Sequence, residues 1–399
     1  MKLLFRNGRI LDGLGDVIEN GWVLVKRGRI EAVGRGSSGA TEGREEAEIV
    51  DLKGRTLLPG LIDCHVHLVL DGGPDPMTKV AEASDAEAVL RMAANGMKTL
   101  KAGVTTVRDL GSKNFADVDL RNAVEAGLVQ GPRVVCSGQM ICITGGHGHQ
   151  LGFVADGPEG VRRAVRAQAG AGVDWIKLMA TGGVLTRGGV PGMPHFNPDE
   201  LQAGVEEAHK LLLRTAAHSQ SLTGSRNAVR AGIDSIEHGV GLDEEIVDEM
   251  ARRGTFLVPT LSAPSNIIAG GEKAGIPAEF VEKTKRLFDE HVAGFQLAAR
   301  AGVKIASGTD AGTPFNLHGE NARELVLMAE HGLPAGEAIQ CATSRSAELL
   351  GMKESVGSVA AGRWADFVVV DGNPLEDLSM LADPDKISAV FRGGVRVDR

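Results

Sequence analysis

The feature that most constrains the fold is an alternation of short apolar runs with longer helical segments over about 270 residues in the middle of the chain. The eight apolar runs are residues 57–67, 104–112, 133–140, 174–180, 213–219, 234–239, 255–260 and 303–312. Intervening segments such as 84–103, 197–213 and 243–254 space their apolar residues three or four apart, which predicts helices. Eight strand–helix units of this kind predict a (β/α)8 barrel.

The two ends of the chain differ from this middle part. Residues 1–56 read as short strands separated by Asn-Gly, Asp-Gly and Arg-Gly turns, and residues 355–399 again alternate β-branched residues with Gly turns. We therefore expect β-rich segments at 1–56 and 355–399 to flank a barrel at 57–354. One additional helix is predicted at 334–350, before the chain returns to the β-rich end.

Charge and composition exclude several classes of protein. A hydrophobic content of 43% with 24% charged residues is typical of a globular chain, and a net charge of −9 without a Lys/Arg block argues against nucleic acids and acidic membranes as partners. No apolar run reaches the roughly 18 residues of a membrane helix, and the start is not a secretory signal. Four scattered cysteines without a CxxC pair favour reduced thiols, so we expect a cytoplasmic protein.

Histidine and aspartate stand at the ends of several runs, where a barrel enzyme carries its chemistry. The first run ends with His65 and His67, which alternate along a strand and therefore point to the same side. The fifth and sixth runs end with His218 and His238, and the eighth contains Asp310 in a Gly-rich end. Singly, each histidine fits an ordinary hydrogen-bonded residue and Asp310 fits a helix cap. Together they favour metal ligands.

Lys177 is the charged residue of the fourth run, between Ile176 and Leu178. A buried ammonium is costly unless it is paired or neutralised. One interpretation is a lysine that bridges two carboxylates inside the barrel. The other is a neutral amine that adds carbon dioxide to become a carbamate, whose two oxygens can bridge two cations.

The order of these groups resembles the amidohydrolase superfamily, in the branch with two metals bridged by a carboxylated lysine. The likeness spans nearly the whole chain through LLPGLIDCHVHL, KLMATGG, SIEHG, SGTDAG and the tail GSVAAGRWADFVVVDGNP. It implies a distorted (β/α)8 TIM barrel with a small β-sandwich domain formed by both termini. GGHGH at 145–149 and KLMATGG are most similar to the prolidase and Xaa-Arg or Xaa-Lys carboxypeptidase-like group, near the ochratoxin-hydrolysing amidohydrolases.

The resemblance also implies a set of ligands for two divalent ions, expected to be Zn²⁺. Carried over residue by residue, the first ion is assigned to His65, His67 and Asp310, the second to His218 and His238, and both to Lys177 as N6-carboxylysine, whose formation consumes CO2. Asp310 is expected to act as the acid/base for a metal-bridging hydroxide.

Substrate contacts are predicted on the loops. His147 and His149 form a second His-x-His in a Gly-rich loop, where they fit additional ligands, loop packing or donors to the substrate; we favour a donor role for His147. Arg187 fits either a partner for a substrate carboxylate or a solvated loop charge. His318 is a further candidate.

The remaining polar residues receive structural interpretations. Histidines at positions outside the run ends are expected on surfaces or helices: His195, His209, His291 and His331. Arg108 and Asp109, at the end of the second run, are expected to pair inside the barrel. Many relatives carry a Tyr soon after the strand-five histidine, whereas this chain has Ser219, Gln220 and no Tyr at all, which leaves the substrate open.

The residues and the resemblance together predict a hydrolase of an amide or peptide C–N bond in a small molecule, such as a dipeptide, an N-acyl amino acid or a related amide, and a homo-oligomer. Three alternatives stay open. They are a lactone or phosphotriester hydrolase on the same two-metal site, a mononuclear deaminase or imidazolonepropionase-like enzyme, and a scaffold that has lost its metals. Lys177 argues against the second, and the full ligand set argues against the third.

Overall fold

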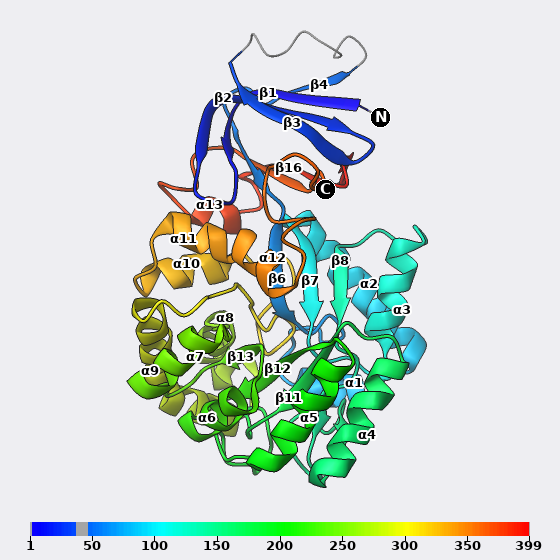
Figure 1. Cartoon of the computed structure of the whole chain (residues 1–399), viewed down its shortest axis with the longest axis vertical. Coiled ribbons are helices and arrows are strands. Elements are labelled where there is room, and N and C mark those ends of the chain that lie inside the picture. The colour runs from blue at the N-terminus through cyan, green and yellow to red at the C-terminus, as the bar shows by residue number, and fades with distance from the viewer. Residues whose placement is uncertain (1, 37–46, 399) are drawn as a thin grey trace. The chain divides into compact units, whose positions relative to one another are not determined.

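The computed structural model describes residues 2–36 and 47–398 (Figure 1). Its contacts divide the chain into two compact units. Unit 1 comprises Met1–Asp63, Met97–Thr106 and Gly319–Arg399, and unit 2 comprises Cys64–Gly96 and Val107–His318. Both ends of the chain thus belong to unit 1, and each unit is described by itself below.

Unit 1 is built on one eight-stranded sheet to which both chain ends contribute. Its strands are β1 (Lys2–Leu11), β2 (Val17–Lys26), β3 (Arg29–Arg35), β4 (Glu48–Asp51), β5 (Thr56–Pro59), β15 (Phe367–Val370), β16 (Ile387–Arg392) and β17 (Val395–Arg396). The order is β17-β16-β15-β5-β1-β2-β3, with β4 paired to β1. β15 runs antiparallel to β5 and so joins the C-terminal strands to the N-terminal ones. The sandwich form expected for this part stays a prediction.

Of two turns that the sequence predicted in unit 1, one is confirmed and the other is wrong. Arg27 and Gly28 have φ of 53° and 78°, as the tight β2–β3 hairpin requires. The break expected at Asn7-Gly8 is wrong, because both residues lie within β1. Asn7 adopts a left-handed φ of 59°, and the register with β2 shifts between Phe5 and Gly8, so the Asn-Gly pair makes a bulge instead of a turn.

Four short helices complete unit 1: α10 (Arg323–Glu330), α11 (Ala335–Cys341), α12 (Ser344–Leu349) and α13 (Ser379–Ala382). A single helix was predicted at 334–350, but two helices, α11 and α12, occupy this segment. The chain breaks between α11 and α12 at Thr343, whose φ and ψ are −134° and −98°. The Thr343 hydroxyl donates to the Ile339 carbonyl, which gives the backbone a local alternative to a continuous helix.

Seven of the eight apolar runs form strands. They are β6 (Leu61–Val66), β7 (Val104–Asp109), β8 (Arg133–Cys136), β11 (Trp175–Met179), β12 (Arg214–Ser219), β13 (Ser235–His238) and β14 (Phe256–Val258). Two short strands that the sequence did not predict, β9 (Ile141–Cys142) and β10 (Phe153–Val154), join them. Regular pairing gives two sheets, β10-β9-β11-β12-β13-β14 and β6-β7-β8, so the ladders do not close into a barrel.

The eighth run, 303–312, makes isolated bridges instead of a strand. Ile305 bridges Leu257 of β14, and Ala311 bridges Val66 of β6. Gly308 explains the close approach, since a Cβ there would lie 2.8 Å from the Cβ of His65. Asp310 then turns the backbone into the left-handed region at a φ of 60°, which ends the extended conformation.

The helices of unit 2 include the segments predicted at 84–103, 197–213 and 243–254. They are α1 (Pro76–Glu82), α2 (Asp85–Lys101, which ends in unit 1), α3 (Ala116–Glu125), α4 (Gly157–Gly170), α5 (Pro198–Lys210), α6 (Leu222–Ala231), α7 (Glu244–Arg253), α8 (Ser262–Gly270) and α9 (Ala278–Arg300). Asn197 and Glu200 form a capping box at the start of α5, and Asp243 caps α7, which ends at the left-handed Gly254. No helix in the described ranges is both long and apolar enough to cross a membrane.

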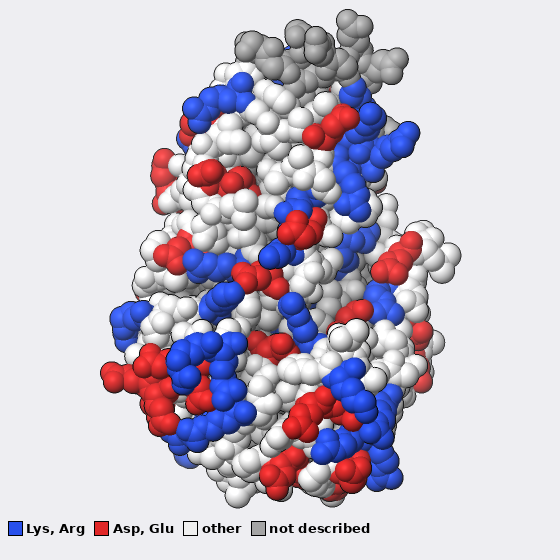
Figure 2. Space-filling model, viewed as in Figure 1, with Lys and Arg blue, Asp and Glu red and all other residues white. Residues whose placement is uncertain are grey.

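Charged side chains of both signs are interspersed over the face of the molecule that Figure 2 draws. Many of them pair across neighbouring helices. Arg230 of α6, for example, lies 2.7 Å from Glu245 of α7, and Arg166 of α4 lies 2.7 Å from Glu207 of α5. The four cysteines are buried and free, as the absence of a CxxC pair led us to expect.

Candidate metal centre

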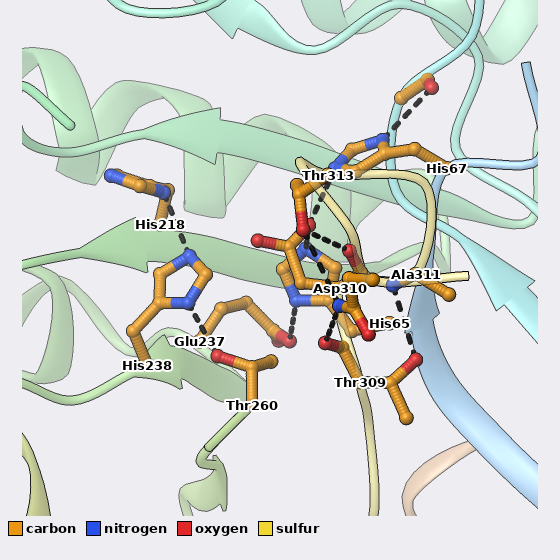
Figure 3. Close-up of polar contacts among 12 residues, drawn as sticks. His65, His67, His218, Glu237, His238, Thr260, Thr309, Asp310, Ala311 and Thr313 are labelled. Carbon is orange, nitrogen blue, oxygen red and sulfur yellow. Dashed lines mark hydrogen bonds and ion pairs between the residues drawn. The ribbon is translucent and has the colours of Figure 1, made fainter. Parts of the chain in front are cut away.

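His65 and His67 direct one ring nitrogen each toward Asp310, as Figure 3 shows. The Nε2 atoms of His65 and His67 lie 3.5 Å and 3.3 Å from Oδ1 of Asp310. His65, His238 and Asp310 each offer a ligand atom within 4.8 Å of the other two, so the three residues form a cluster that can hold a metal ion. The alternation predicted from the first run is therefore present in the structure.

Hydrogen bonds at the opposite nitrogens fix both rings. Nδ1 of His65 lies 2.8 Å from Oε2 of Glu237, and Nδ1 of His67 lies 3.0 Å from the carbonyl oxygen of Gly111. Because both partners are acceptors, each Nδ1 carries the proton and each Nε2 presents a lone pair. This is the arrangement by which proteins orient histidine ligands.

Arg108 forms an ion pair with Glu237, and both side chains are fully buried. Nη2 of Arg108 donates to Oε1 of Glu237 at 2.9 Å, and Nη1 donates to the Ser235 hydroxyl at 3.1 Å. Nε donates to the Cys64 carbonyl at 2.6 Å, and the guanidinium lies 4.3 Å from the ring centre of Trp175. Arg108, Glu237 and His65 thus form a continuous buried chain of contacts.

The pairing expected between Arg108 and Asp109 is wrong. Successive residues of a strand point to opposite faces, so the Asp109 carboxylate is directed away and accepts backbone N–H groups of Leu68 at 2.8 Å and Gly111 at 3.2 Å. Burial, and next the nearby Asp117 carboxylate, raise the pKa of Asp109 well above its usual value.

His218 and His238 face each other. Nδ1 of His218 lies 2.8 Å from Nε2 of His238, and Nδ1 of His238 lies 2.7 Å from the hydroxyl of Thr260. Nε2 of His218 is buried and has no hydrogen-bond partner among the described residues. A neutral imidazole has one ring nitrogen without a proton. When the proton of each ring is on its other nitrogen, Nδ1 of His218 and Nε2 of His238 can bind the same cation.

Burial keeps these imidazoles neutral. It lowers the pKa of His65, His218 and His238 well below the usual value and that of His67 to about 4. The nearby Lys177 lowers all four values further, whereas the hydrogen bond to Gly111 opposes the change at His67. At neutral pH all four rings therefore have lone pairs available for a metal.

Lys177 lies in the middle of β11 and is 2% exposed. Its Nζ has no hydrogen-bond partner in the described part of the chain. Burial, opposed by Glu237 and reinforced by Arg108, lowers the pKa of the amine to about 8. The interpretation of a lysine that bridges two carboxylates is therefore not supported by any hydrogen bond to Nζ. A buried polar group without a partner calls for an explanation.

Three residues of the centre adopt left-handed backbone conformations. His238, Thr260 and Asp310 have φ of 70°, 53° and 60°, although none is glycine. Such conformations cost about 1–3 kcal/mol each and concentrate at functional sites. Each lies at or just after the end of an extended segment, where the change of direction brings its side chain to the centre.

All six predicted ligands line a single cavity: His65, His67, Lys177, His218, His238 and Asp310. The side chains come from β6, β11, β12, β13 and the eighth run, which lie far apart in the sequence.

Of the four predicted substrate contacts, His147 lines this cavity. Its Nδ1 lies 2.6 Å from the Thr186 hydroxyl, and burial lowers its pKa to about 3. His149 is exposed and lies 2.8 Å from the Gly146 carbonyl. Arg187 is exposed and forms an ion pair with Asp75.

His318 lies 3.0 Å from the Leu70 carbonyl through Nε2. Like His149 and Arg187, it is not among the described residues that line the cavity. The substrate roles of these three residues stay predictions.

Glu237, Thr260 and His291 were not predicted as part of the site. Glu237, like Lys177, is a charged residue in an apolar run, which indicates a functional or paired side chain. Strict alternation along a strand, however, directs Glu237 and His238 to opposite faces. The left-handed backbone at His238 brings both to the centre. His291 lies in α9, as expected for a helix, yet it is buried, lines the cavity and lies 2.5 Å from the Pro259 carbonyl. No sequence signal distinguished it.

His195 also departs from its interpretation. It lies in a loop between β11 and α5, neither in a helix nor fully exposed, and its Nδ1 lies 3.4 Å from the backbone nitrogen of His147.

Comparison with known proteins gives a consistent set of relatives. The Amidohydrolase family model matches residues 56–397. Ochratoxinase of Aspergillus niger is 32% identical over 369 residues, which cover 85% of this chain and 75% of that protein. A Xaa-Pro dipeptidase solved with bound methionine is 32% identical with a TM-score of 0.91 over 100% of both chains. A putative prolidase from Bifidobacterium longum is 32% identical with a TM-score of 0.87, covering 100% of this chain and 95% of that one.

Proposed function

The chain belongs to the amidohydrolase family and is a hydrolase that acts on C–N bonds, and from this premise we propose that it uses two metal ions to cleave an amide bond in a small molecule. One observation carries the proposal. Six side chains of ligand type, from five separate segments, line one cavity. The likeness to a Xaa-Pro dipeptidase and to ochratoxinase supports an amide or peptide bond as the target.

The donor atoms fit two divalent ions. We assign His65, His67 and Asp310 to one ion and His218 and His238 to the other; the short distances between donor atoms within each group support this division, and His238 also offers a ligand atom within 4.8 Å of those of His65 and Asp310. The chemistry of the donors, imidazole nitrogen and carboxylate oxygen, suits Zn²⁺. Ions bound there would polarise the substrate carbonyl and activate a water molecule.

Lys177 is proposed as a carboxylated lysine that serves both ions. Its Nζ is buried without a partner, which an added carboxylate would explain, since the carbamate oxygens would bind the cations. With a pKa of about 8, about one tenth of the amine is neutral at pH 7 and can attack CO2.

Asp310 is proposed as the acid/base. Its carboxylate lies beside the Nε2 atoms of His65 and His67, at the centre of the cluster. In this position it can accept the proton of the attacking water and pass it to the departing nitrogen. His147, which lines the same cavity, can donate Nε2–H to a substrate carbonyl while Nδ1 accepts from Thr186.

The proposed architecture is a distorted barrel of the eight runs, with a hydrolase domain at 57–354 and a β-sandwich made of 1–56 and 355–399. The supporting observations are the seven strands, the bridges made by the eighth run, and the sheet shared by both chain ends. We further propose, from the sequence, a cytoplasmic homo-oligomer.

The experiment is a substrate panel with enzyme produced in zinc and bicarbonate. Dipeptides, N-acyl amino acids, aryl amides, lactones and phosphotriesters are assayed together, and bound metal is counted. We expect about two metal ions per chain and hydrolysis of amides. Activity confined to lactones and phosphotriesters would contradict the amide assignment and leave the metal site intact.

Lys177→Ala provides the matched test of the centre, with the exposed Lys210→Ala as control. We expect Lys177→Ala to abolish activity and a small carboxylic acid to restore part of it, because the acid can replace the carbamate. Lys210→Ala should behave as the parent. Full activity in Lys177→Ala, or a metal content near zero in the parent, would refute the two-metal centre.

A further inference from the structure

The wall of the cavity around the candidate centre is apolar. Val184 and Leu185 of the loop after β11, Ile267 of α8 and Leu287 of α9 line it. The same four residues belong to one hydrophobic cluster of unit 2, in which Val184 and Ile267 are buried and Leu185 and Leu287 pack against them. Because this wall is part of a packed core, its shape is formed before a substrate enters.

Most polar side chains of the wall are already engaged. Thr284 and Thr313 donate their hydroxyl protons to backbone carbonyl oxygens at 2.7 Å and 2.8 Å, and Nε2 of His291 lies 2.5 Å from another carbonyl oxygen. Oε1 of Gln220 accepts from the backbone nitrogen of Val184 at 3.1 Å. These side chains are uncharged or already hydrogen-bonded, so they suit neutral polar atoms of a substrate better than an anionic group.

The described lining contains one Lys and no Arg. That residue is Lys177, whose amine the proposed function places in a carbamate. Two nearby cations are held elsewhere: Arg187 pairs with Asp75, and Lys283 pairs with Glu279 and donates to a loop carbonyl. In the proposed function the metal ions hold the attacking water and the scissile carbonyl, so a carboxylate elsewhere in this cavity would lose its hydration without gaining an ion pair.

We propose that the substrates are neutral N-aryl or N-alkyl amides that carry no free carboxylate on either side of the scissile bond. This inference rests on the proposed function and narrows its substrate class. Water adds across the C–N bond, the acyl carbon gains the hydroxyl group, and the nitrogen leaves with a proton as an uncharged apolar amine. The apolar wall takes the aryl or alkyl groups by burial, which needs no charged partner.

The test is a matched series of anilides. Benzanilide is compared with 4-benzamidobenzoate, which adds a carboxylate on the amine side, and with 4-(phenylcarbamoyl)benzoate, which adds it on the acyl side. N-(4-nitrophenyl)benzamide matches the first acid in size without its charge. We expect kcat/KM for benzanilide to exceed that of either acid at least tenfold, and the nitro compound to bind like benzanilide. Equal or better use of either acid would overturn the inference.

Calorimetric binding of the same compounds separates this inference from the proposed function. If metal-replete enzyme hydrolyses no amide, the proposed function fails. Tighter binding of the neutral compounds by tenfold or more would still support the neutral cavity, and tighter binding of an acid would overturn it.

A variant pair provides a second measurement. Met77 of α1 lines the cavity and is half-buried, whereas Leu90 of α2 is 72% exposed and outside it. We expect Met77→Lys to improve the affinity for 4-benzamidobenzoate relative to benzanilide about tenfold, because it supplies the missing cation, and Leu90→Lys to leave the ratio unchanged. An unchanged ratio in Met77→Lys would count against the inference.

Discussion

Glu237→Gln is the most informative perturbation of the candidate centre, because the Glu237 carboxylate contacts both the candidate ligand His65 and Arg108. Its carboxylate is fully buried and lies 2.8 Å from Nδ1 of His65 and 2.9 Å from Nη2 of Arg108. The amide of Gln has nearly the same shape but no charge. The substitution therefore removes charge from the contact with His65 and leaves Arg108 without its buried counter-ion.

Two effects of different size follow. A buried cation deprived of its partner costs about 3–5 kcal/mol of the free energy of unfolding. Loss of the carboxylate behind a histidine ligand typically lowers metal affinity about 10- to 100-fold, which equals about 1.4–2.8 kcal/mol of binding free energy. We expect both changes in Glu237→Gln. The hydrogen bond to Ser235 at 2.6 Å survives only if the amide oxygen faces that hydroxyl.

The assays are urea unfolding of metal-free protein and competition for zinc against a fluorescent chelator. Glu245→Gln is the matched control, because Glu245 also bonds an arginine, Arg230, at 2.7 Å, but both side chains are exposed to solvent. We expect it to cost less than about 1 kcal/mol and to leave zinc affinity unchanged. The double variant Arg108→Met with Glu237→Gln should recover part of the stability and none of the zinc affinity. A zinc affinity in Glu237→Gln within twofold of the parent would refute the idea that Glu237 orients His65.

Three further predictions concern the same centre. Burial lowers the pKa of Lys177 from 10.5 to about 8. Between these two pH values the unfolded chain binds more protons than the folded one. The free energy of unfolding of metal-free protein should therefore rise by about 3 kcal/mol as the pH increases from 8 to 10.5. Lys177→Met should lose this slope in urea unfolding, and an identical slope in both proteins would contradict the burial of a free amine. Thr260→Val keeps the shape of the side chain but removes the hydroxyl that lies 2.7 Å from Nδ1 of His238, so zinc affinity should fall about tenfold, whereas the surface variant Thr78→Val should not change it. Removal of metal by a chelator should lower the melting temperature and restore it on zinc addition, because the ions bind the folded state only, and a melting temperature indifferent to zinc would exclude a resident metal.

The sequence by itself determined the parts of the fold that depend on local periodicity. The short apolar runs predicted eight strands, of which seven are present, and Asp243 and Gly254 marked the ends of α7. It also identified the six candidate ligands, because each stands at or within an apolar run, where a polar residue requires a reason. The likeness to amidohydrolases was visible for the same reason, since its motifs are contiguous stretches.

Only the tertiary structure decided what depends on contacts between distant segments. Arg108 and Asp109 are neighbours in the chain, yet Arg108 pairs with Glu237, 129 residues away, because a strand directs successive side chains to opposite faces. Periodicity does not record the left-handed backbone of His238 and Asp310, nor the close approach of Gly308 to His65 in the eighth run, which makes isolated bridges instead of a strand. The apolar character of the cavity wall likewise arises from helices and loops that meet only in the folded chain, because local patterns specify faces but not which faces come together.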